Sequence, residues 1–159
     1  MSSLHSAGRP PPLSDAVLDS SAVLALLLAE PGAETVADVL PGALLSAVNL
    51  AEVIASLASR GMPALEVRSA VEATGIEIVD FDGEQACLFG ELGRETVGLG
   101  LTLGARACLA LARQRSLRVM TADPVWRRLA GFEVRLIRDG GDPVPPAPVD
   151  ARPSWLRGL

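Results

Sequence analysis

The residues of this chain that are best suited to catalysis are carboxylates at the ends of short apolar runs. They are Asp19, Asp80, Asp82 and Asp123, together with Glu52 near the start of the helix expected after another run. In open parallel sheets, ligands bind beyond the carboxyl ends of the strands, because loops and helix N-termini converge there. We therefore expect several of these acids to gather along one edge of a sheet.

Clustered carboxylates of this kind favour a metal centre. Carboxylates held close together repel one another, and in a partly buried site this costs free energy unless a cation neutralises them. A hard divalent ion such as Mg²⁺ or Mn²⁺ takes oxygen ligands. It lowers the pKa of a bound water and stabilises charge on a phosphoryl group. The acids thus indicate metal-dependent hydrolysis of a phosphodiester.

Other kinds of catalytic site lack the residues that they need. The single histidine, His5, lies in the polar N-terminal segment. Cys87 and Cys108 are the two cysteines; they lie in apolar helical contexts without metal-ligand spacing, and we expect free, buried thiols. A Ser/His or Cys/His nucleophile and a His-ligated zinc site are therefore not expected in the folded part of the chain.

Each acid also has a structural interpretation, as a helix cap or as a solvated charge. Asp19, Asp82 and Asp123 each precede an expected helix. Asn49 and Glu52 resemble a capping pair, in which the glutamate reaches back to the N–H of the cap residue. A cap explains each acid taken singly, whereas the metal site explains why they occur together.

The elements expected to position these acids are strands and helices in alternation, which predicts an α/β fold. A central, mainly parallel five-stranded sheet should be flanked by helices on both faces. The expected strands are 16–19, 43–47, 76–80, 117–121 and 134–137. The expected helices are 20–29, 33–40, 48–60, 63–74, 83–97, 103–114 and 124–130.

The expected helix 48–60 has two distinct faces. An apolar stripe at helical spacing is predicted to be buried, and it consists of Leu50, Val53, Ile54 and Leu57. The opposite, polar stripe consists of Asn49, Glu52, Ser56 and Ser59. Glu52 is therefore predicted to point away from the principal apolar face.

Length and composition favour one folded domain at 16–138, between a mobile leader at 1–15 and a Pro/Gly-rich tail at 139–159. Neither a membrane span nor a secretory signal is recognisable, so we expect a cytoplasmic protein. The net charge of −5 argues against a nucleic-acid partner, but all fourteen basic residues are arginines. Arginine suits bidentate phosphate contacts.

Four segments carry a family resemblance, and they occur in order at 17–22, 46–53, 100–112 and 119–126. Together they resemble the motifs of PIN-domain nucleases, and most closely those of VapC toxins from bacterial VapBC toxin–antitoxin modules. The resemblance covers about residues 16–138. It implies a Mg²⁺- or Mn²⁺-dependent endoribonuclease that cleaves structured RNA such as tRNA or rRNA. It also implies a homodimer and a VapB-like antitoxin as partner.

The resemblance also implies roles for individual residues. The metal ligands would be Asp19, Glu52 and Asp123, with position 105 as the fourth acidic position of the catalytic site. Thr121 would shape the site, as would Asn49, and Arg106 would contact the RNA backbone.

Position 105 departs from the family pattern, because the chain reads Gly104-Ala105-Arg106 where the family usually has Gly-Asp-Arg. An acid there would also complete a capping box with Thr102, whereas alanine is simply a good helix former. We therefore interpret the chain as an Asp-to-Ala variant, engineered or natural, with impaired catalysis. The alternatives are a non-catalytic PIN fold that binds RNA or protein, and a PIN nuclease of RNA processing without an antitoxin.

Overall fold

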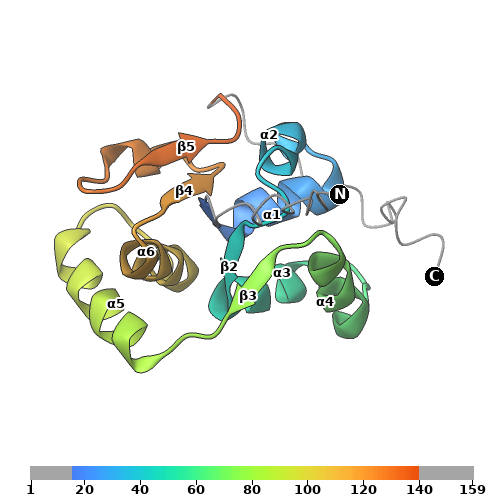
Figure 1. Cartoon of the computed structure of the whole chain (residues 1–159), viewed down its shortest axis with the longest axis horizontal. Coiled ribbons are helices and arrows are strands. Elements are labelled where there is room, and N and C mark those ends of the chain that lie inside the picture. The colour runs from blue at the N-terminus through green and yellow to red at the C-terminus, as the bar shows by residue number, and fades with distance from the viewer. Residues whose placement is uncertain (1–15, 140–159) are drawn as a thin grey trace, which may run out of the picture.

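The computed structural model describes residues 16–139, in which strands and helices alternate along the chain (Figure 1). The strands are β1 (Ala16–Leu18), β2 (Leu44–Ser46), β3 (Glu77–Val79), β4 (Arg118–Thr121) and β5 (Val134–Leu136). The α-helices are α1 (Ser20–Leu28), α2 (Ala33–Ala37), α3 (Ala47–Ala58), α4 (Ala64–Ala73), α5 (Gly83–Glu95) and α6 (Leu103–Arg115). A 3₁₀ helix, η1 (Pro124–Arg128), replaces the longer helix expected at 124–130. The expected leader and almost all of the expected tail lie outside the described residues.

The five strands form one sheet in the order β3-β2-β1-β4-β5, and every neighbouring pair is parallel. The predicted α/β fold is thereby confirmed. The chain starts at the centre of the sheet, builds outward through β2 and β3, and then returns to the other side of β1 with β4. The order of strands reverses between β1 and β4, and ligands bind at the carboxyl ends of strands at such a switch point.

Each face of the sheet packs against its own set of helices (Figure 1). Leu18 and Leu45 point into a core shared with α1, α3 and α4, which contribute residues such as Val23, Val53 and Val67. Their chain neighbours point into a second core with α5, α6 and η1, which consists of Val17, Leu44, Leu92, Leu109, Val119 and Trp126 among others. Successive strand residues alternate between the two cores, as the pleat requires. Both faces are covered, which explains why the central strand β1 is apolar throughout.

Side-chain caps set the starts of several helices. Asp82 accepts from the N–H of Gln85 at the start of α5, and Asp123 accepts from the N–H of Val125 at the start of η1. Both acids therefore act as caps, as one interpretation of the sequence predicted.

The expected capping pair of Asn49 and Glu52 is wrong, because α3 begins earlier than the pattern suggested. Ser46 is its N-cap and accepts from the N–H of Val48. Asn49 lies inside the helix and is fully buried, so the polar stripe to which it was assigned is not exposed at this position. The reason is tertiary, since this face of α3 packs against α1 and α6.

Two smaller findings complete the fold. Cys108 is a free, buried cysteine, but Cys87 is free and exposed, so its predicted burial is wrong. The face of α5 that carries Cys87 is not covered by another described element. No helix in residues 16–139 is long and apolar enough to cross a membrane.

Candidate metal centre

Asp19 lies at the carboxyl end of β1, at the switch point of the sheet. Its main-chain N–H donates to the carbonyl of Met120 at 2.9 Å, which joins it to β4. Its side chain is only 9% exposed. Asp19 is the N-cap of α1 by position, but its carboxylate makes no capping hydrogen bond. The interpretation of this side chain as a helix cap is therefore wrong.

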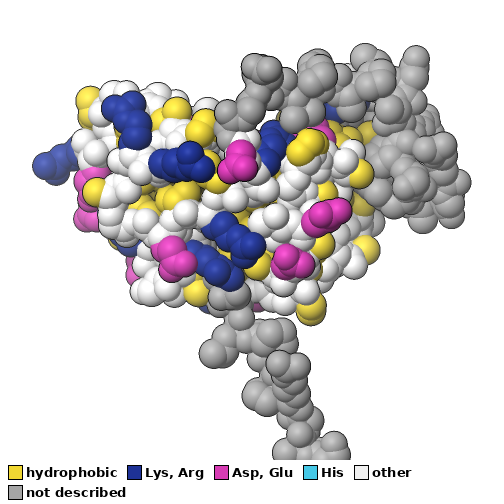
Figure 2. Space-filling view, turned by 90° about the horizontal axis from the view of Figure 1, so that it is seen from above, with side chains coloured by type: hydrophobic (Ala, Val, Ile, Leu, Met, Phe, Trp, Pro, Cys, Tyr) yellow, Lys and Arg dark blue, Asp and Glu magenta, His cyan; other side chains and the backbone are white. Residues whose placement is uncertain are grey.

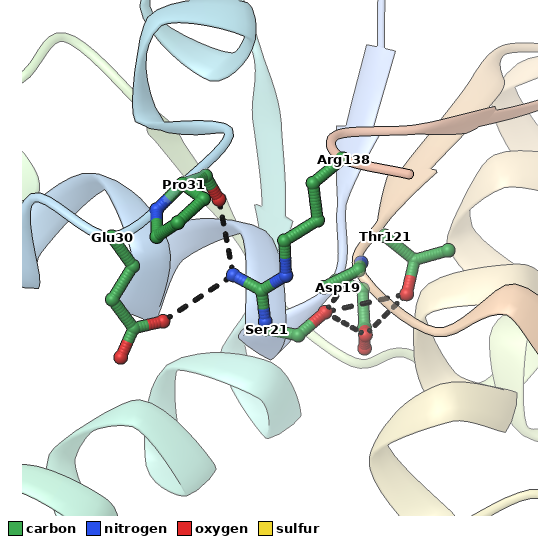
Figure 3. Close-up of polar contacts among 7 residues, drawn as sticks. Asp19, Ser21, Glu30, Pro31, Thr121 and Arg138 are labelled. Atoms are coloured by element: carbon green, nitrogen blue, oxygen red, sulfur yellow. Dashed lines mark hydrogen bonds and ion pairs between the residues drawn. The ribbon is translucent and has the colours of Figure 1, made fainter. Parts of the chain in front are cut away.

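Two hydroxyls orient the Asp19 carboxylate (Figure 3). Ser21 Oγ donates to Asp19 Oδ2 at 2.8 Å, and Thr121 Oγ1 donates to the same atom at 2.9 Å. The main chain after β4 in turn holds these hydroxyls: Ser21 Oγ accepts from the N–H of Ala122, and Thr121 Oγ1 accepts from the N–H of Asp123. The site therefore depends on contacts between segments about a hundred residues apart.

The electrostatic setting of Asp19 disfavours its charged form. Burial raises the pKa of Asp19 above its ordinary value, and the nearby Glu52 carboxylate raises it further. The hydrogen bonds from Ser21 and Thr121 act in the opposite direction, because they stabilise the carboxylate. Neither acid has an ion-pair partner among residues 16–139. A buried carboxylate beside a partly buried one, without a counter-charge from the described residues, is the setting that a cation would relieve.

Glu52 points out of α3 toward the starts of α1 and α6. Ser20 Oγ donates to Glu52 Oε2 at 2.5 Å. The carboxylate lies directly against the Cα of Gly104 in the first turn of α6, where an added Cβ would overlap it. A glycine is thus required at 104 for Glu52 to occupy this position.

Position 105 is the next residue of the same helical turn. Ala105 is 6% exposed, and its N–H donates to the side chain of the N-cap residue Thr102 at 3.1 Å. The predicted helix start at Thr102 is therefore confirmed. Because Gly104 packs against the Glu52 carboxylate, position 105 belongs to the helical turn that borders the two acids.

The other expected acids are not part of this arrangement. Asp123 is exposed, and its carboxylate is used to cap η1, although its main chain is tied to Thr121. Asp80 and Asp82 follow β3, which is separated from β1 by β2. Both are exposed, so the expectation that they join the cluster is wrong. A strand's place in the sheet, rather than its place in the sequence, decides which acids meet.

The residues present fit a hard divalent cation in kind, although the set of acids is incomplete. Carboxylate and hydroxyl oxygens surround the site, and these are the donors that Mg²⁺ and Mn²⁺ prefer. Asn49 contributes a buried amide oxygen with no hydrogen-bond partner in the described part of the chain. Within residues 16–139, however, no group of three or more His, Cys, Asp or Glu side chains is placed to hold a metal ion.

Arg106, the arginine expected to contact RNA, and two other arginines pack against partners within the described chain. Arg106 stacks on the ring of Phe89 in α5, with 4.4 Å between the guanidinium carbon and the ring centroid. Arg113 binds both carboxylate oxygens of Glu95. Arg138 follows β5 and reaches across to Glu30 and to the carbonyl of Pro31 (Figure 3). These cations have structural partners, which the sequence did not reveal.

Sequence reasoning gave no role to Ser20, Ser21 and Gly104, although all three shape the site. Ser20 and Ser21 directly follow Asp19, and Gly104 directly precedes position 105. Small residues beside the candidate acids were thus the available signal. Their function requires the tertiary contacts, because each acts on a side chain from another element or on an adjacent acid.

Comparisons with known proteins identify the fold of the chain. The family model of the PIN domain matches residues 16–132. No curated protein matches the chain. A toxin–antitoxin complex from Klebsiella pneumoniae aligns with a TM-score of 0.65 at 18% identity, covering 79% of this chain and 99% of that one. DNA-bound VapBC from Salmonella typhimurium aligns with a TM-score of 0.64 at 17% identity, covering 79% of this chain and 100% of that one.

A third solved structure is VapC20 from Mycobacterium tuberculosis, described as a sarcin–ricin loop cleaving toxin. It aligns with a TM-score of 0.62 at 16% identity, covering 74% of this chain and 96% of that one. At such identities, the likeness to these structures is one of fold.

Proposed function

The chain belongs to the PIN domain family, and from that premise we propose that it is the toxin of a type II toxin–antitoxin module. PIN domains are generally nucleases. The activity proposed is a Mg²⁺- or Mn²⁺-dependent endoribonuclease that cleaves structured RNA such as tRNA or rRNA, with a nuclease domain at 16–138. Alanine at 105 leaves the chain as written catalytically impaired. The observation that carries this proposal is the pair of uncompensated acids, Asp19 and Glu52, at the switch point of the sheet.

The chain's own residues prepare the site for a cation. Asp19 and Glu52 would hold the cation. An aspartate at 105, in the form of the protein without the Asp-to-Ala change, would be a further ligand, and Asp123 would lie at the edge of the site. When bound, Mg²⁺ or Mn²⁺ supplies an activated water and neutralises charge on the phosphoryl group. Ser21 and Thr121 orient the Asp19 carboxylate. With one acid missing, the site should bind the ion weakly and turn over little RNA.

The RNA backbone would be bound by arginines for which residues 16–139 provide no ion-pair partner. Arg127 and Arg128 are exposed on η1, which begins at Asp123. Figure 2 shows basic and acidic side chains interspersed over one face of the molecule. Such a surface suits phosphate contacts made one by one rather than a broad basic patch. We retain Arg106 as a candidate, although its stacking on Phe89 gives it a structural role first.

The partners proposed are a VapB-like antitoxin and a second copy of the chain, in the cytoplasm. Some of the structures similar in fold are toxin–antitoxin complexes, as their descriptions state. The net charge of −5 suits a basic antitoxin segment.

Restoring the missing acid tests the proposal directly. We expect Ala105→Asp to gain Mg²⁺- or Mn²⁺-dependent cleavage of tRNA or rRNA, by about a hundredfold or more, since electrostatic stabilisation in an active site has this magnitude. Ala86→Asp, which adds the same charge on the exposed face of α5, should gain nothing. Adding Glu52→Gln to Ala105→Asp should remove the gain. A restored protein no more active than the chain as written would show that position 105 is not catalytic.

A second candidate is a non-catalytic PIN fold that binds RNA or protein. It is favoured by the absence of a third acid within reach of Asp19 and Glu52 in the described residues. Calorimetric titration with Mn²⁺ separates the two functions. A nuclease scaffold should bind the ion once Ala105→Asp is made, whereas a binding module should not.

A further inference from the structure

Asn49 occupies an unusual place for an amide side chain in the first turn of α3. It is completely buried, and its Nδ2 donates two hydrogen bonds to other helices. One goes to Ser20 Oγ in α1 at 2.9 Å, and the other goes to the main-chain carbonyl of Gly104 in α6 at 3.0 Å. The Asn49 side chain therefore joins the start of α1, which follows Asp19, to the start of α6, which contains position 105.

The bond to Ser20 has a direct consequence for Glu52. A serine hydroxyl has one proton to donate, and Ser20 Oγ already accepts from Asn49. The Ser20 hydroxyl donates its own proton to Glu52 Oε2, which lies 2.5 Å from Ser20 Oγ. The competing acceptor, the main-chain carbonyl oxygen of Asn49, lies farther away at 3.4 Å. A hydrogen bond to a carboxylate is short and strong. Asn49 thus orients the hydroxyl that holds Glu52.

The bond to Gly104 acts on the other side of the same carboxylate. Gly104 presents its bare Cα to Glu52, and its carbonyl is held by Asn49. The first turn of α6, including position 105, is thereby kept at a set distance from Glu52. Loss of the Asn49 amide would free both the carboxylate and the helical turn that faces it.

We propose that Asn49 is a positioning residue, which sets the Glu52 carboxylate through Ser20 and holds position 105 beside it through the Gly104 carbonyl. The consequence of Asn49 for metal binding rests on the proposed function. Its effect on Glu52 does not, since the contacts involve only the protein. Residues that orient ligands in this way typically change metal affinity by about 10–100-fold when they are removed.

The first experiment measures the Glu52 carboxyl ¹³C resonance at fixed neutral pH in the chain as written. Asn49→Leu keeps the number and branching of the heavy atoms and removes the amide, and Ser20→Ala removes the hydroxyl. We expect both variants to shift the resonance in the same direction. The double variant should shift it by less than the sum of the two single changes, because Asn49 acts on Glu52 partly through Ser20. An unshifted resonance in either variant, or additive shifts in the double variant, overturns the proposal.

Gln85→Met is the matched control, because Gln85 is also a fully buried amide with two donated bonds and an unpartnered oxygen. It lies in α5, and its partners are Asp80 and Gln114. It should lower the melting temperature without shifting the Glu52 resonance. If Asn49→Leu does not fold, Ser20→Ala still decides the matter, since an unshifted Glu52 resonance there removes the link.

The second experiment titrates Mn²⁺ calorimetrically into Ala105→Asp with and without Asn49→Leu. We expect the affinity to fall by at least about tenfold in the presence of Asn49→Leu. Equal affinities overturn the positioning role. If Ala105→Asp binds no Mn²⁺ while the Glu52 resonances remain coupled, the proposed nuclease function fails and the positioning role of Asn49 stands.

Discussion

The acids at the β1–β4 switch point differ from the acids along α5 in how their charge is compensated. Burial raises the pKa of Asp19. Along α5, the N–H of Gln85 lowers the pKa of Asp82, and the Arg113 guanidinium lowers that of Glu95. Asp82 and Glu95 are both exposed. The partner of Asp82 is a helix N–H, and the partner of Glu95 is an arginine. Residues of the same chemical type thus have opposite pKa shifts, and the uncompensated acid, Asp19, is the one proposed as a metal ligand.

Adding a methyl group beside the switch point and adding one on α5 should have the most clearly different effects. Gly104→Ala places a Cβ where the Glu52 carboxylate lies, whereas Gly90→Ala on α5 meets nothing within 4 Å. Because Glu52 is a flexible side chain, it should swing aside at modest cost to the fold. We expect Mn²⁺ affinity in the Ala105→Asp background to fall by about tenfold or more for Gly104→Ala.

The control Gly90→Ala should leave that affinity unchanged and stabilise the fold by about 0.5–1 kcal/mol, as alanine does in a helix. Calorimetric titration and thermal denaturation give the two measurements. Equal affinities for both variants would show that Gly104 does not make room for Glu52.

The opposite pKa shifts predict opposite dependence of stability on pH. The raised pKa of Asp19 favours its protonated form in the folded state, so its contribution is favourable below the unfolded pKa and is lost as the pH rises through the folded value. We therefore expect Asp19→Asn to raise the free energy of unfolding at pH 7, with the gain shrinking toward pH 4.

Asp82→Asn should behave in reverse. The lowered pKa of Asp82 stabilises the fold above the unfolded pKa, and this stabilisation is lost as the pH falls. We expect the substitution to destabilise the fold at pH 7 and to matter less in acid. Urea denaturation at both pH values checks the pair, and shifts of the same sign for both variants would contradict the contrast between the regions.

The smallest effect is expected from the ion pair of Arg113 and Glu95, with 2.8 Å between Nη2 and Oε2. The two side chains are 27% and 52% exposed, so water and salt screen the attraction. A double-mutant cycle with Arg113→Ala and Glu95→Ala should give a small coupling free energy that weakens with added salt. A much larger coupling would show that charges on α5 are not simply solvated.

Much of the fold was predictable because it is encoded by local pattern. Strands were expected at 16–19 and 117–121, where the structure has Ala16–Leu18 and Arg118–Thr121, and the caps at Thr102 and Asp123 marked helix starts. The predicted position of Asp19 at a strand end is confirmed by its place after β1. Its role as a metal ligand stays a prediction, as do those of Glu52 and Asp123.

The features that could not be predicted depend on which elements become neighbours. Asn49 has the polarity of a surface residue, yet it is buried between α1 and α6. Arg106 was expected to contact RNA, yet it stacks on Phe89. The pattern of residues within one helix does not predict which other element will pack against it.

The sequence by itself determined the alternation of strands and helices, the helix starts and the acids available for chemistry, because spacing and capping act over a few residues. Only the tertiary structure decided that Glu52 lies near enough to Asp19 to raise its pKa, while Asp80 and Asp82 stay apart from them. The physical reason is that strand order is set by packing between distant segments. The same packing leaves the Asp19 carboxylate buried without a counter-charge from the described residues.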